Sequence, residues 1–74
     1  PQYDWQAILN QFNELINYYG MPGADQPDLK NQAALEKKLL EWMGAQGKDA
    51  PVPGAATIRR YVSKWLMELE KTRS

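Results

Sequence analysis

Apolar residues return every three or four positions in the first part of the chain, which is the spacing of one face of an α-helix. Asp4 precedes this stretch as an N-cap, where its carboxylate would accept hydrogen bonds from the first free backbone amides. Gly20, followed by Pro22, marks the end of the pattern. The pattern therefore predicts a helix over residues 4–19. Its apolar face consists of Trp5, Ile8, Leu9, Phe12, Leu15, Ile16 and Tyr19.

A second apolar stripe predicts a helix over residues 29–46. Asp28 and Asn31 are both suitable N-caps, so the sequence allows two starts for this helix that differ by about one turn. Gly44 loosens its end and Gly47 stops it. The stripe consists of Leu35, Leu39, Trp42 and Met43, with Ala33 and Leu40 beside it. The charged residues that we expect to point mainly outward are Glu36, Lys37, Lys38 and Glu41.

A third helix is predicted over residues 54–72. It cannot begin earlier, because Pro51 and Pro53 have a fixed φ and lack the amide that a helix needs. Two connectors rich in proline and glycine, residues 20–28 and 47–54, separate the three helices. The apolar face of the third helix consists of Ile58, Tyr61, Val62, Trp65, Leu66 and Leu69.

The three stripes predict an all-α fold, a small three-helix bundle in which each apolar face covers the other two. A length of 74 residues supports one core, so we expect a single domain over residues 1–74. The chain starts at Pro1 with no charged and then apolar leader, which indicates a domain excised from a longer protein. Tyr18 lies off the first stripe and is expected to be exposed. The aromatic residues expected in the core are Trp5, Phe12, Trp42, Tyr61 and Trp65.

The composition argues against catalysis. Cysteine and histidine are absent, so the chain has no thiol nucleophile and no imidazole base to activate Ser63 or Ser74. We therefore expect no enzyme activity, no cofactor, no metal and no small-molecule substrate. Its apolar runs are far shorter than the roughly 20 residues that cross a bilayer, so no membrane partner is expected either. The lack of cysteine fits a reducing compartment, which we take to be the cytoplasm.

The charges are unevenly distributed, although the formal net charge is zero. Residues 1–20 carry two acidic residues and no basic one, whereas residues 55–74 carry five basic and two acidic residues. The third helix should therefore have a cationic face that is free of acidic residues until Glu68. On a helical projection, one outward line is formed by Thr57, Arg60, Lys64 and Lys71, with Arg59 and Ser63 beside it.

The segment from Pro53 to Leu66 resembles the recognition helix of helix-turn-helix DNA-binding domains. Members of that superfamily often have a Thr or Ser, a branched apolar residue and then one or two arginines, and here this order is Thr57, Ile58, Arg59 and Arg60. The resemblance implies a helix that lies in the major groove and presents hydroxyl and guanidinium groups to phosphates and base edges. The DNA-binding residues that it implies are Thr57, Arg59, Arg60, Ser63, Lys64 and Lys71.

The sequence leaves two functions open. The first is binding of double-stranded DNA by the third helix, in transcription regulation. A homodimer, or a basic region outside this segment, would supply the phosphate contacts that a neutral monomer lacks. The second is a protein-interaction or oligomerisation domain of a larger protein. Its contact surface would be surplus aromatic residues such as Tyr18 and Tyr19, or the uncharged outer face of the first helix, which carries Gln6, Asn10, Gln11, Asn13 and Asn17. Convergence of the arginines and lysine on one open face favours DNA, whereas an exposed apolar or amide patch elsewhere favours a protein partner.

Overall fold

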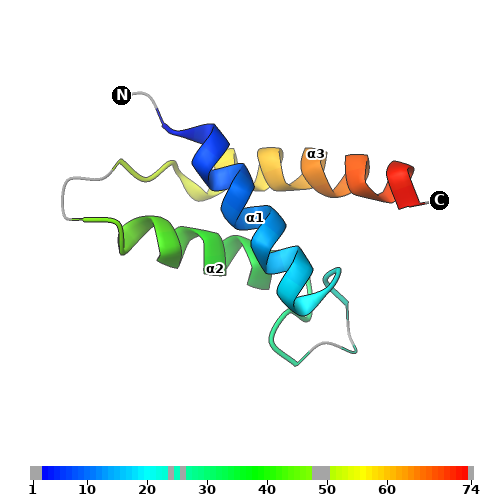
Figure 1. Ribbon diagram of the computed structural model, residues 1–74. Helices are drawn as coiled ribbons and strands as arrows, with labels where there is room; N and C mark the ends of the chain where they lie inside the picture. Colours follow the sequence, from blue (N-terminus) through cyan, green and yellow to red (C-terminus); the bar gives the residue numbers. More distant parts are fainter. Residues whose placement is uncertain (1–2, 24, 26, 48–50, 74) are drawn as a thin grey trace.

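The computed structural model confirms an all-α three-helix bundle (Figure 1). It describes residues 3–23, 25, 27–47 and 51–73, and no strand occurs in these ranges. The helices are α1 (Trp5–Tyr19), α2 (Gln32–Gly44) and α3 (Ala55–Arg73). Helices α2 and α3 pack side by side, and α1 lies diagonally across them. Residues 24, 26 and 48–50, which belong to the two predicted connectors, lie outside the described residues.

Helix α1 has the boundaries that its caps predict. The Asp4 carboxylate accepts a hydrogen bond from the Ala7 amide at 3.1 Å, which satisfies one of the free donors of the first turn. At the other end the amide of Gly20 donates to the carbonyl of Ile16 at 2.8 Å. Gly20 has a φ of 87°, a conformation that glycine adopts without steric cost. Both residues therefore set the ends of α1.

Helix α2 is shorter than the predicted range of 29–46 at both ends, because it begins at Gln32 and finishes at Gly44. Its start is set by Asn31, whose side chain accepts from the Ala34 amide at 2.9 Å. Leu29 does not start the helix. It is fully buried in the connector, where its side chain packs into the core. Leu29 therefore belongs to the core although it lies in the connector and outside α2.

We expect replacement of Asn31 by alanine to lower the free energy of unfolding by about 1 kcal/mol, because α2 would lose its N-cap acceptor. The matched control is Asp28→Ala, which removes the other candidate cap from an exposed position and should cost less than about 0.5 kcal/mol. Urea denaturation followed by circular dichroism measures both. Equal losses in the two variants would contradict the assignment of the cap to Asn31.

The core lies where α1 crosses the other two helices. The fully or almost fully buried apolar residues are Ile8, Phe12, Ile16, Leu29, Leu35, Leu39, Met43, Ile58 and Val62. All of them except Leu29 belong to the predicted stripes. In α3 the buried residues are confined to the first half, because the second half extends beyond the region covered by the other helices (Figure 1).

The prediction that the stripe aromatics lie in the core is met in full by Phe12 and in part by the three tryptophans, which pack against the core. Phe12 is buried, but Trp5, Trp42 and Trp65 are half-buried, and Tyr61 is 36% exposed. For Trp5, Tyr61 and Trp65 the reason is the spacing of α1 and α3, whose Cα atoms do not approach within 8 Å anywhere in the described helices. Large rings fill this wider gap: those of Trp5 and Tyr61 stack with centroids 3.7 Å apart. The three faces therefore do not cover one another equally. Ala33, predicted to flank the α2 stripe, is exposed.

Candidate nucleic-acid interface

The first half of α3, residues 55–64, carries three cations and no acidic residue. The structure brings these cations to one open surface, a shallow depression of about 600 Å³. We call this surface the α3 depression, and it is lined by Arg59, Arg60, Ser63, Lys64, Met67, Glu68 and Lys71. The predicted convergence of Arg59, Arg60 and Lys64 on one open face is therefore present in the structure.

The six predicted site residues do not all lie on that surface in the same way. Arg60, Lys64 and Lys71 are exposed along one line of the helix, as the projection predicts. Thr57 is half-buried beside the fully buried Ile58, and it does not line the depression. Thr57 is therefore less exposed than the other residues of the predicted outward line, although Ala55 and Ala56 before it are exposed.

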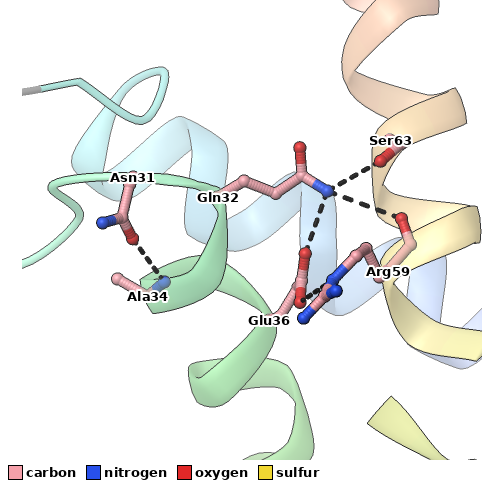
Figure 2. A network of polar contacts seen from close by, with 6 residues as sticks. All are labelled: Asn31, Gln32, Ala34, Glu36, Arg59 and Ser63. Atoms are coloured by element: carbon pink, nitrogen blue, oxygen red, sulfur yellow. Dashed lines mark hydrogen bonds and ion pairs between the residues drawn. The ribbon is translucent and has the colours of Figure 1, made fainter. Parts of the chain in front are cut away.

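Ser63 faces α2, where it joins a network of polar contacts (Figure 2). The Nε2 atom of Gln32 donates to the hydroxyl oxygen of Ser63 at 2.8 Å and to Oε2 of Glu36 at 2.9 Å. The Arg59 carbonyl is a third and more distant acceptor, at 3.5 Å. An amide nitrogen has two hydrogens, so the two short contacts account for both of them. Gln32 therefore ties the Ser63 hydroxyl of α3 to the Glu36 carboxylate of α2.

Glu36 was expected to point outward, and that expectation was wrong. The residue is only 6% exposed and its side chain 9%, and Oε1 lies 3.5 Å from Nε of Arg59. A buried charge is strongly destabilising without a partner, and here the partners are Arg59 and Gln32. The spacing of Gln32, Glu36, Leu39 and Met43 in the sequence follows one helical line and was the signal that could have located this residue. The cationic face therefore has an acidic residue beside it.

The ion pair gives Arg59 a structural role that Arg60 lacks. We expect Arg59→Ala to lower the free energy of unfolding by about 1 kcal/mol, because the buried carboxylate of Glu36 would lose its cation. The figure is modest because the Arg59 side chain is 68% exposed and water screens the pair. Arg60→Ala is the matched control and should stay within about 0.5 kcal/mol of the unmodified protein. Urea melts of both variants give the comparison, and identical midpoints would contradict the role of the ion pair.

The outer face of α1 is uncharged and polar over most of its length. Gln6, Asn10, Asn13 and Asn17 are exposed, and Gln6 donates to Asn10 at 3.0 Å, while Gln11 is half-buried. Tyr18 is 80% exposed at the end of this face, which confirms the prediction made for it. An exposed amide face is therefore present as well as the cationic one.

No protein-family model, no curated protein and no solved structure matches this chain. Within the described ranges, no three carboxylates are grouped in a way that would hold a metal ion. None of the helices described by the structure is long and apolar enough to cross a membrane. The described features that bear on function are the α3 depression with the network beside it and the exposed amide face of α1.

Proposed function

We propose that this domain binds double-stranded DNA in the manner of a helix-turn-helix protein, with α3 as the recognition helix. The observation that supports this most is the shared exposure of Arg59, Arg60 and Lys64 on the α3 depression. Within the first half of the helix no acidic residue interrupts them. The sequence resemblance to recognition helices covers the same residues.

The dimensions and chemistry of α3 fit this role. A single helix with its side chains is about 10–12 Å across, and the major groove is about 12 Å wide. Arg60 and Lys64 lie one turn apart, so their cationic groups can reach phosphates while the helix lies in the groove. On the opposite side, Ile58 and Val62 anchor the same half of α3 in the core. A rigid helix therefore carries the proposed contacts.

Two features distinguish this domain from the tight form of the motif. Helices α2 and α3 are joined by residues 45–54, whereas the tight motif uses roughly three or four residues. The domain also has zero net charge, so its electrostatic attraction to DNA is local to α3. A homodimer would double the number of phosphate contacts and bind two half-sites, and we include it in the proposal.

The salt dependence of DNA binding tests the proposal. Fluorescence anisotropy of a labelled random-sequence duplex is measured from about 50 to 200 mM salt. With phosphate contacts from Arg60 and Lys64, the slope of log affinity against log salt should be about −1.8 per domain, since each contact contributes roughly −0.9. A dimer should give about twice that slope. If no salt-sensitive binding occurs up to high micromolar protein, in the domain or in a longer form that dimerises, the proposal is wrong.

The alternative function is a protein-interaction domain, and the exposure of Tyr18 is the observation that favours it. Tyrosine is enriched at protein interfaces, and the amide side chains along α1 would supply hydrogen bonds around it. Self-association is one form of this function. Sedimentation velocity of the unmodified protein and of Tyr18→Ala would detect it, because loss of a tyrosine from an interface should shift the population toward monomer.

A further inference from the structure

We propose that Arg59 reads a guanine base and that Glu36 is the residue that positions its guanidinium group. This inference rests on the proposed DNA-binding function and assigns different DNA contacts to different residues of the same surface. Arg60 and Lys64 contact phosphates, whereas Arg59 provides sequence preference. The structure distinguishes Arg59 from the other two cations by its ion pair with Glu36.

Across the described part of the chain, Arg59 is paired with a carboxylate, and neither Arg60 nor Lys64 has an ion-pair partner. A phosphate is a diffuse target that mobile cations reach from several directions, so it needs no fixed side chain. Reading a base edge needs donors at defined positions, which requires that the side chain be held before the DNA arrives. Among the three, only Arg59 has a carboxylate partner that could restrain it in this way.

The ion pair leaves the two terminal amino groups of the Arg59 guanidinium, which would contact the base, free of Glu36. The contact to Glu36 is made by Nε, at 3.5 Å from Oε1. The two terminal amino groups of the guanidinium remain to donate, and together they match the O6 and N7 acceptors of guanine. The side chain is 68% exposed and Arg59 lines the α3 depression, so we infer that a base can reach these amino groups from that side. Glu36 therefore restrains the inner side of the guanidinium and leaves the outer side for a base.

The carboxylate is itself held in place. Its Oε2 atom accepts from Gln32, and the same amide group of Gln32 donates to Ser63 on α3. Both oxygens of Glu36 are thus engaged, one by Gln32 and one by Arg59, at a position that is 6% exposed. A fixed carboxylate on α2 gives the arginine on α3 a defined direction, because the two helices pack directly against each other. Glu36 touches no DNA in this proposal and acts only through Arg59.

The experiment compares sequence preference with total affinity. Binding sites are selected from a random duplex pool with the unmodified protein, and the affinity for the selected site is divided by that for the same site with guanine replaced by adenine. Arg59→Lys should reduce this ratio by roughly 5- to 150-fold and leave the salt slope unchanged, because the charge is kept and the bidentate donors are lost. Glu36→Gln should also reduce it, with the same salt slope. The matched control, Arg60→Lys, should keep both the ratio and the slope.

Several results would overturn the inference and leave the proposed function standing. These are a selected site without guanine, an unchanged ratio in Arg59→Lys, or a loss of the ratio in Arg60→Lys. An unchanged ratio in Glu36→Gln would show that the ion pair is only structural, provided that circular dichroism shows that the variant is folded. If the unmodified protein has no salt-sensitive DNA binding, the proposed function fails and the inference fails with it.

Discussion

Replacement of Phe12 by alanine is expected to leave most of the protein unfolded at 25 °C. Phe12 is 1% exposed at the centre of α1 and is in contact with Trp65, with ring centroids 5.2 Å apart. Truncation of a buried phenylalanine costs about 3–5 kcal/mol, because its transfer energy is lost and a cavity remains. A domain of this size has a free energy of unfolding of roughly 3–5 kcal/mol, so the cost of the substitution is about as large as the total stability of the protein. Circular dichroism at 222 nm with a urea titration measures the effect.

The control for this experiment is Tyr18→Ala on the same helix. Tyr18 is 80% exposed, so its removal takes almost no apolar surface out of the folded core and should cost less than about 0.5 kcal/mol. Phe12→Leu keeps most of the volume and should cost about 1–1.5 kcal/mol, which keeps the protein measurable if the alanine variant does not fold. A Phe12→Ala variant as stable as Tyr18→Ala would contradict the placement of the core.

The second large effect is expected for DNA binding in the double variant Arg60→Ala/Lys64→Ala. Both side chains are exposed on the α3 depression, and neither packs into the core, so the unfolding free energy should change by less than about 1 kcal/mol in total. If both contact phosphates, the slope of log affinity against log salt should become flatter by about 1.8, since each contact contributes roughly 0.9. Affinity at low salt should fall most, because that is where counterion release is most favourable. Anisotropy titrations at four salt concentrations measure the slope.

The matched control removes the same charge from another place. Lys30 and Lys37 are exposed, on the first connector and on α2, and neither lines the α3 depression. Lys30→Ala/Lys37→Ala should therefore leave the slope within about 0.5 of the unmodified protein. An equal change of slope in both double variants would show that binding follows net charge alone. That result would contradict the assignment of the DNA contacts to α3.

Much of the fold follows from local rules that act within one helix. The cap at Asp4 and the stop at Gly20 set the ends of α1, because a short side chain and a flexible backbone satisfy the end groups of a helix whatever surrounds it. The periodic apolar residues of the three stripes include all of the core except Leu29. The grouping of cations on α3 is equally local, since residues three and four apart always share a face of a helix.

The tertiary structure decided what depends on the distance between helices. The wide spacing of α1 and α3 leaves Trp5 and Trp65 half-buried, although their positions in the stripes are those of core residues. Leu29 enters the core from a connector, which a helical period does not predict. Close packing of α2 against α3 buries Glu36 beside Arg59 and so makes one of three similar cations different from the others. Periodicity gives the direction of a side chain from its own helix, whereas burial and ion pairing depend on which neighbour lies in that direction and how near it is.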